Sequence, residues 1–218
     1  MNPELRWPRR GLYLVTPDEP DTRRLLDRVA EVIAEGPVLV QYRNKTASPA
    51  RRREQAGELM PLCREYGVPL VINDDWRLAA ELQADGAHLG RDDGALAQAR
   101  EALGPHAILG ASCYDQLPLA ERAAAAGASY LAFGAFFASA TKPGARRADL
   151  SLLRDSAASG LPRVAIGGIT PDNAGGLVAA GADLVAVIGS IFDAPDPAAA
   201  ARALRDGFSH IPASTLPR

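Results

Sequence analysis

The chain has 218 residues, of which 47% are hydrophobic and 23% charged, and its formal net charge at pH 7 is −2. A chain of this composition folds into a soluble globular protein with a sizeable core. The small net charge gives no electrostatic reason to expect nucleic acid or a membrane surface as a partner. No apolar run approaches the ~18 residues that a membrane span needs, and residues 1–10 contain no apolar signal segment. We therefore expect a cytoplasmic protein.

Short runs of β-branched and other apolar residues alternate along the chain with Ala-, Leu- and Arg-rich stretches of helical period. The runs predict strands, in chain order at 11–16, 38–43, 69–74, 86–90, 107–112, 130–135, 163–168 and 184–190. The stretches between them predict helices near 22–35, 50–66, 76–84, 95–103, 117–126, 150–158, 171–180 and 197–206. Several helices stop at a glycine, which readily adopts the left-handed conformation that closes a helix; these are Gly36, Gly67, Gly104, Gly127, Gly160, Gly181 and Gly207.

Eight strands, each followed by a helix, are typical of a (β/α)8 TIM barrel and less so of an open doubly wound sheet. No change of composition and no Ser/Gly-rich linker marks a domain boundary. We predict a single-domain α/β barrel over residues 11–207, with residues 1–10 as an N-terminal extension and 208–218 as a C-terminal tail.

The two cysteines, Cys63 and Cys113, lie far apart in the sequence and form no CxxC motif. This pattern is a weak signal for a structural metal or a disulfide. We expect buried free thiols in a reducing compartment.

Polar residues follow the ends of the predicted strands, where the loops of a barrel form its catalytic mouth. Asp74 closes the third strand and Asp93 follows the fourth, so the two carboxylates can share one hard cation. Alternation along the second strand places Gln41, Arg43 and Lys45 on one side. Carboxylates, cations and an amide at one mouth indicate a site for a metal ion and a polyphosphate.

Each of these residues also has a simpler interpretation. Arg43 and Lys45 could be solvated charges at a strand end, and Asp74 and Asp93 could cap the helices that follow them. His88, inside the fourth strand, is more typical of a hydrogen-bonded histidine near the core than of a ligand. The joint occurrence of these polar residues at strand ends favours a binding site over separate structural roles.

The end of the seventh predicted strand indicates a second anion site. The strand runs into Gly167 and Gly168, and a helix then opens with Thr170 as N-cap and Pro171 in its first position. Glycines let backbone N–H groups approach an anion, and the loops after strands seven and eight often bind phosphate in barrels. The end of strand eight, 188–190, adds further amides. The alternative is that the glycines serve only close packing, and no nucleotide-binding glycine motif is present.

Six short motifs occur in order: Gln41-x-Arg43-x-Lys45, Ile72-Asn73-Asp74, Gly86-Ala87-His88-Leu89-Gly90-x-x-Asp93, Leu109-Gly110-x-Ser112, Phe133-Gly134-x-x-x-x-Ser139-x-Thr141-Lys142 and Ile166-Gly167-Gly168-Ile169. Together they resemble the thiamine phosphate synthase family, from about Gly11 to Gly207. The chain departs from the family's pattern at Ala135, Ala138, Ser139, Arg91-Asp92 and Gly189. The change at Gly189 leaves fewer side-chain donors for a phosphate monoester.

The resemblance implies an enzyme acting on two small phosphorylated substrates. It implies that 4-amino-2-methyl-5-hydroxymethylpyrimidine diphosphate condenses with 4-methyl-5-(2-phosphoethyl)thiazole to give thiamine phosphate and pyrophosphate, with Mg²⁺ held by Asp74 and Asp93. The implied contacts to the pyrimidine diphosphate are Gln41, Arg43, Lys45, Asn73, Ser112 and Lys142. Those to the thiazole phosphate are Ser139, Thr141, Gly168, Ile188 and Gly189. Arg43, Ser112 and Lys142 are the implied catalytic residues, Ser112 lying beside the pyrimidine and the departing oxygen.

Two other functions stay open at this point. A thiazole tautomerase of the same superfamily handles no diphosphate, and would have no use for Asp74, Asp93 and the polar residues at 41–45 together. A non-catalytic sensor of phosphorylated ligands would need neither a metal nor a clamp for a leaving group. The sequence does not set the oligomeric state. The segment 138–147, which contains Lys142, is a candidate lid over the site.

Overall fold

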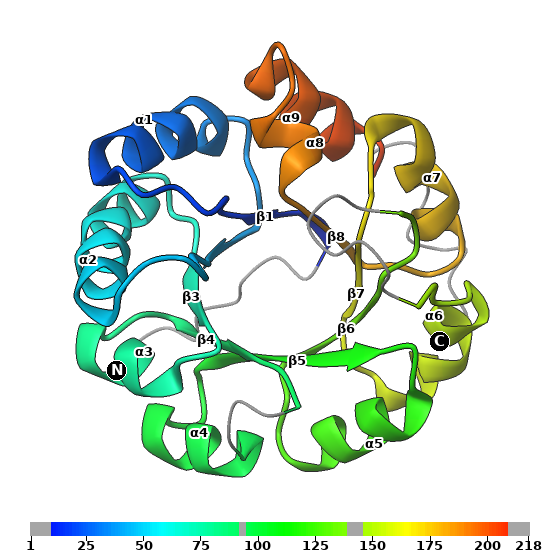
Figure 1. Cartoon of the computed structure of the whole chain (residues 1–218). Coiled ribbons are helices and arrows are strands. Elements are labelled where there is room, and N and C mark those ends of the chain that lie inside the picture. Colours follow the sequence, from blue (N-terminus) through cyan, green and yellow to red (C-terminus); the bar gives the residue numbers. More distant parts are fainter. Residues whose placement is uncertain (1–9, 92–94, 139–145, 209–218) are drawn as a thin grey trace.

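The computed structural model describes residues 10–91, 95–138 and 146–208. Eight parallel strands close into a barrel in chain order, with the helices outside it (Figure 1). The strands are β1 (Gly11–Val15), β2 (Leu39–Tyr42), β3 (Leu70–Asn73), β4 (Gly86–Leu89), β5 (Ile108–Tyr114), β6 (Tyr130–Gly134), β7 (Arg163–Ile166) and β8 (Leu184–Val187). The predicted (β/α)8 TIM barrel is confirmed.

The helices follow the predicted alternation with one addition. They are α1 (Thr22–Ile33), α2 (Pro49–Glu65), α3 (Trp76–Leu82), α4 (Leu96–Leu103), α5 (Leu117–Ala125), α6 (Ser151–Asp155) with the 3₁₀ turn η1 (Ser156–Ser159), α7 (Pro171–Ala179), α8 (Gly189–Phe192) and α9 (Pro197–Asp206). The short helix α8 was predicted as the end of strand eight. A four-residue helix is too short to show a helical period in the sequence, so it was missed.

The helix ends show where glycine is required. Six of the seven glycines predicted to close helices have positive φ, between 65° and 109°. Gly207 was predicted wrongly: it has φ −56° and continues the right-handed turn of α9. Conversely α3 ends at Gln83 with φ 55°, a left-handed residue that the sequence did not indicate.

Apolar residues pack in two places because strand residues alternate in direction. Leu12 and Leu14 of β1 belong to a cluster that includes helix residues such as Leu25, so they face the surrounding helices. Tyr13 and Val15 belong to a cluster drawn almost wholly from strands, which fills the barrel. The interior is therefore packed below the mouth, and the open chemistry is restricted to the ends of the strands.

Both cysteines are buried and free, as expected. Burial raises the pKa of the Cys63 and Cys113 thiols to about 12, so neither is a thiolate near neutral pH. Within the three described ranges no helix is long and apolar enough to cross a membrane. β1 begins at Gly11 and α9 ends at Asp206, inside the predicted barrel limits of 11–207. The extension at 1–10 and the tail at 208–218 stay predictions.

Candidate active site

The end of β2 presents polar side chains in the predicted alternating directions. Tyr42 points outward, since its hydroxyl donates to Gln55 of α2 at 2.9 Å. Gln41 points the other way, into the barrel, where it is 5% exposed and its Nε2 donates to the Tyr13 hydroxyl at 2.6 Å. Gln41 therefore reaches the site from below, while residues 43–45 lie at the mouth.

Arg43 and Lys45 each pair with a carboxylate. Nη1 of Arg43 lies 3.0 Å from both carboxylate oxygens of Asp18 in the loop after β1. Nζ of Lys45 lies 3.4 Å from Oδ2 of Asp74, which follows β3. The structure thus brings together Lys45 and Asp74, two residues singled out independently in the sequence.

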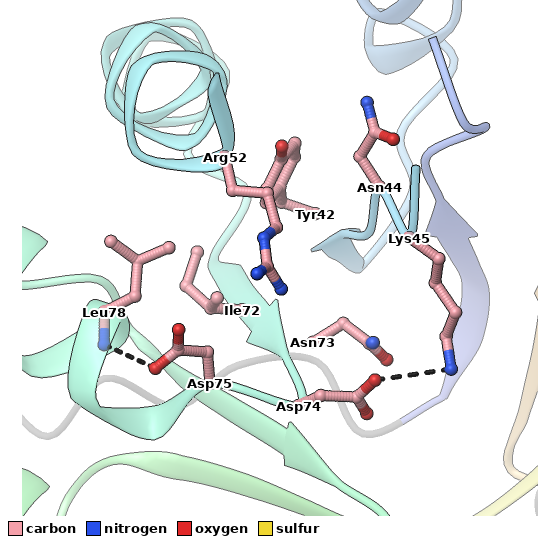
Figure 2. Close-up of a pocket in the computed structure, with 9 residues that line it drawn as sticks. All are labelled: Tyr42, Asn44, Lys45, Arg52, Ile72, Asn73, Asp74, Asp75 and Leu78. Atoms are coloured by element: carbon pink, nitrogen blue, oxygen red, sulfur yellow. Dashed lines mark hydrogen bonds and ion pairs between the residues drawn. The ribbon is translucent and has the colours of Figure 1, made fainter. Parts of the chain in front are cut away.

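The two aspartates after β3 have different roles (Figure 2). Asp75 is the cap of α3, because its carboxylate accepts from the Leu78 amide at 2.9 Å. Asp74 is not that cap: its backbone has φ 62°, and its amide donates to the His88 carbonyl at 2.8 Å. A positive φ is uncommon outside glycine, although Asp tolerates it, and such strain is typical of functional sites. The capping interpretation of Asp74 is therefore wrong.

A pocket opens between the ends of β2 and β3, and most of the residues that line it are polar (Figure 2). It is lined by Tyr42, Asn44, Lys45, Arg52, Ile72, Asn73, Asp74, Asp75 and Leu78. Asn73, the last residue of β3, adds its side-chain amide to this lining (Figure 2). The pocket therefore combines positive charge with oxygen donors.

Arg52 is a residue of this pocket that the sequence analysis did not single out. Helix α2 contains three consecutive arginines, and two of them pair with carboxylates: Arg51 with Glu54 at 3.0 Å, and Arg53 with Glu81. Arg52 turns toward the pocket, and its buried Nε has no hydrogen-bond partner among the described residues. Three adjacent arginines give no signal in the sequence of which one faces the mouth.

Ser112 and His88 are joined across neighbouring strands. The Ser112 hydroxyl lies 2.9 Å from Nε2 of His88, and Nδ1 of His88 lies 3.0 Å from the Tyr130 hydroxyl. His88 is 8% exposed, which confirms the interpretation of a hydrogen-bonded histidine near the core. Ser112 is half-buried, and the ladder between β5 and β6 becomes irregular directly after it. The strand continues past this irregularity to Tyr114, which pairs with Phe133 of β6.

The glycines after β7 meet the neighbouring loop closely. Gly167 and Gly168 have φ 101° and 63°. A Cβ on Gly168 would lie 2.2 Å from the Ala138 carbonyl oxygen and 2.8 Å from Cβ of Phe137, so no larger residue fits without moving the loop after β6. Close packing is thus one role of these glycines. It also joins the end of β7 to the segment that continues into 139–145.

The end of β8 and the start of α7 complete this half of the mouth. Thr170 and Asn173 form a reciprocal capping box at α7, with Pro171 in the first turn, as the sequence indicated for this N-terminus. Ile188 and Gly189 lie where β8 passes into α8, and both are partly exposed. A Cβ on Gly189 would lie 2.9 Å from Oδ2 of Asp193.

The model of the thiamine monophosphate synthase family matches residues 12–191 of the chain. The chain belongs to this family. A thiamine-phosphate synthase of Methylobacillus flagellatus is 55% identical over 202 residues, covering 93% of this chain and 97% of that protein. One from Chromobacterium violaceum is 56% identical over 198 residues, covering 91% and 96%. The solved thiamine phosphate pyrophosphorylase from Pyrococcus furiosus is 33% identical with a TM-score of 0.81, covering 93% of this chain and 96% of that one.

Four of the residues assigned by resemblance to thiamine phosphate synthases lie outside the described residues: Asp93, Ser139, Thr141 and Lys142. The candidate lid, 138–147, lies mostly there as well. The others lie at or just below the C-terminal ends of β2, β3, β5, β7 and β8, on one side of the barrel.

The donors at the end of β3 fit a magnesium ion by their chemistry. Asn73 and Asp74 offer side-chain oxygen atoms, which Mg²⁺ prefers, and neither sulfur nor imidazole is among the residues that line the pocket. The described ranges contain no group of three or more His, Cys, Asp or Glu residues able to hold a metal. Mg²⁺ is commonly held by only one or two carboxylates together with water and substrate phosphates.

Proposed function

We propose that the mouth of this barrel condenses 4-amino-2-methyl-5-hydroxymethylpyrimidine diphosphate with 4-methyl-5-(2-phosphoethyl)thiazole, giving thiamine phosphate and pyrophosphate. The observation that carries the proposal is the contact between Lys45 and Asp74 beside the pocket at the ends of β2 and β3, in a chain of the thiamine monophosphate synthase family. Cations and carboxylates side by side suit a diphosphate that is bound together with a metal ion.

The first half of the mouth holds the diphosphate in this proposal. Gln41, Arg43, Lys45, Asn73 and Lys142 contact its oxygens, with Arg43 giving the bidentate grip that a guanidinium allows. Lys45 and Lys142 are the only lysines in the sequence, and every other fixed cation is an arginine. A lysine is a compact point charge, suited to negative charge that accumulates on one departing group.

Asp74 and Asp93 hold Mg²⁺ in this proposal. A bound Mg²⁺ supplies fixed positive charge beside the phosphate oxygens. Asp74 is suited to this role because its left-handed backbone conformation and the hydrogen bond from its amide to the His88 carbonyl of β4 fix the backbone from which its carboxylate extends. The ion pair with Lys45 shows that charges of both signs are tolerated within 3.4 Å of each other here.

The second half of the mouth receives the thiazole phosphate. Gly168, Ile188 and Gly189 lie at the ends of β7 and β8, where barrels commonly bind a phosphate through backbone amides. Ser139 and Thr141 add side-chain hydroxyls from the segment after β6. The loop after β6 packs on Gly168, so the segment that leads to Ser139 and Thr141 starts beside the end of β7.

The chemical step needs charge stabilisation and no protein nucleophile. The C–O bond of the pyrimidine diphosphate breaks with its electron pair staying on the pyrophosphate oxygen, which leaves a pyrimidinylmethyl cation. The lone pair of the thiazole nitrogen then forms the C–N bond. Arg43 and Lys142 stabilise the charge that develops on pyrophosphate, and Ser112 contacts the pyrimidine and the departing oxygen. The raised thiol pKa values agree with this, because neither cysteine is available as a thiolate.

The proposal includes a cytoplasmic location and two small-molecule partners, with no nucleic acid or membrane. Purified protein incubated with Mg²⁺ and both substrates should form thiamine phosphate and pyrophosphate in equal amounts, and omission of either substrate should abolish both products. A thiazole tautomerase would convert a thiazole isomer without releasing pyrophosphate. A sensor would bind a phosphorylated ligand and release nothing, so this one assay separates the three functions.

A further inference from the structure

A row of hydrogen-bonded polar side chains crosses the interior of the barrel beneath the mouth. Nε2 of Gln41 donates to the Tyr13 hydroxyl at 2.6 Å, and the Tyr13 and Tyr130 hydroxyls lie 2.7 Å apart. The Tyr130 hydroxyl lies 3.0 Å from Nδ1 of His88, and Nε2 of His88 lies 2.9 Å from the Ser112 hydroxyl. The five residues come from five strands, β1, β2, β4, β5 and β6.

The row places polar side chains inside an otherwise apolar core. Tyr13 is 1% exposed and Tyr130 0%, and apolar residues such as Val71 and Leu184 pack in the same cluster inside the barrel. Buried polar groups are tolerated when they are hydrogen-bonded, and removal of one member of the row would destabilise the fold because it leaves a buried polar atom without a partner. The fold also makes room for it: a Cβ on Gly110 would lie 2.2 Å from the Tyr130 hydroxyl oxygen.

The contacts allow one direction of hydrogen bonding that begins at Gln41. The Gln41 amide nitrogen can only donate, so the Tyr13 oxygen accepts from it, and the Tyr13 hydroxyl can in turn donate to Tyr130, 2.7 Å away. Burial raises the pKa of both phenols, so each keeps its hydrogen. In that direction Tyr130 donates to Nδ1 of His88, 3.0 Å away, and the neutral imidazole carries its hydrogen on Nε2.

We propose that the row runs in this direction, and that Tyr13, Tyr130 and His88 are positioning residues that set the direction of the Ser112 hydroxyl. His88 donates through Nε2 to the Ser112 oxygen, and the Ser112 hydrogen is thereby left to donate to the substrate at the mouth. With the opposite tautomer Ser112 would donate to His88, and the substrate would lose that hydrogen bond. The inference rests on the proposed function for the identity of the substrate; the direction of the row does not depend on it.

The direct test is the tautomer of His88, read by ¹⁵N NMR of histidine-labelled protein without substrate. His88 is one of three histidines in the chain, and His88→Asn assigns its signals by their absence. Wild-type His88 should be neutral with its hydrogen on Nε2, and Tyr130→Phe should give a mixture of tautomers. A hydrogen on Nδ1, or on both nitrogens, in the wild type would overturn the proposal even if the variant failed to fold.

Kinetics supply the second test, with a matched control. Tyr130→Phe should lower kcat about tenfold, the size of one net hydrogen bond, with little change in KM for the thiazole phosphate. Ser156→Ala removes another buried hydroxyl, one that donates to the Leu152 carbonyl at 2.6 Å and lies outside the row and the pocket, and should leave kcat unchanged. Because Tyr130 acts through Ser112, Ser112→Ala combined with Tyr130→Phe should be no slower than Ser112→Ala alone.

If the loss of kcat in the double variant equalled the product of the two single losses, Tyr130 would have only a structural role. The inference would then fail while the proposed function stood. If wild type formed no thiamine phosphate at all, the proposed function would fail. The tautomer of His88 would then still decide the direction of the row.

Discussion

Asp74 and its neighbour Asp75 offer a matched pair of substitutions. Asp74→Asn keeps the size of the side chain and removes only the charge. Asn, like Asp, tolerates the left-handed backbone at φ 62°. Asp75→Asn removes the same charge one residue away and keeps a good cap for α3. If Asp74 holds the metal, Asp74→Asn should lower kcat on the order of 10²-fold or more at limiting Mg²⁺. Asp75→Asn should stay near wild type.

The two variants should be similarly stable. The Lys45 and Asp74 side chains are 51% and 31% exposed, and an ion pair of that exposure contributes ~0.2–1 kcal/mol. Asp75 loses an interaction of similar size, ~0.3–1 kcal/mol, with the first turn of α3. For a domain of this length either loss corresponds to a change in Tm of at most about 4 °C. A large difference in activity would therefore not reflect unfolding.

The assay is thiamine phosphate formation across a range of Mg²⁺ concentrations, with thermal melting of both variants alongside. Asp74→Asn should need more Mg²⁺ to reach its own maximum, and that maximum should stay below wild type. Near-normal turnover of Asp74→Asn at limiting Mg²⁺, or equal losses in both variants, would refute the assignment of Asp74 to the metal.

Four further outcomes are expected. Arg43→Ala should raise KM for the pyrimidine diphosphate and leave that for the thiazole phosphate nearly unchanged, with Arg51→Ala, an exposed cation paired with Glu54, as the control; a rise in both KM values would contradict the division of the mouth. Lys142→Met should lower the single-turnover rate ~10²-fold and affect diphosphate binding much less; equal losses would limit Lys142 to substrate binding. With only two lysines in the chain, reductive ¹³C-methylation should give two lysine side-chain NMR signals that both move when Mg²⁺ and pyrophosphate are added; a signal that stays still removes that lysine from the site. Finally, burial raises the pKa of Cys63 from 9.0 to about 12, so the thiol ionises first in the unfolded chain, and stability should fall as pH rises from about 9 toward about 12. Between pH 8 and pH 10 the free energy of unfolding should drop by on the order of 1 kcal/mol less in Cys63→Ala than in wild type. Equal drops in the two proteins would refute this expectation.

The barrel was predictable because its signals are local. Strand runs and helical stretches alternate eight times, and that rhythm alone indicates parallel strands with helices outside them. The errors lie where local signals are weakest. The helix α8 is four residues long, Gln83 takes a left-handed conformation without being glycine, and Gly207 continues a right-handed turn.

The sequence predicted which strand ends form the site, but it did not predict which side chains contact one another there. Position along the second strand predicted that Gln41, Arg43 and Lys45 share one side, but not that Gln41 begins a row of hydrogen bonds through Tyr13. Backbone angles decide which of the adjacent residues Asp74 and Asp75 caps α3, and the sequence gives no signal of those angles. Arg52 reaches the pocket from the first part of α2, and its direction is set by packing between elements distant in the sequence.

The most direct test of the two-part mouth is a crystal structure with thiamine phosphate, pyrophosphate and Mg²⁺ bound. We expect pyrophosphate beside Arg43 and Lys45, Mg²⁺ on Asp74 and Asp93, and the phosphate of thiamine phosphate at Gly168 and Gly189. Pyrophosphate bound at the ends of β7 and β8, or a metal ion that does not contact Asp74, would contradict it.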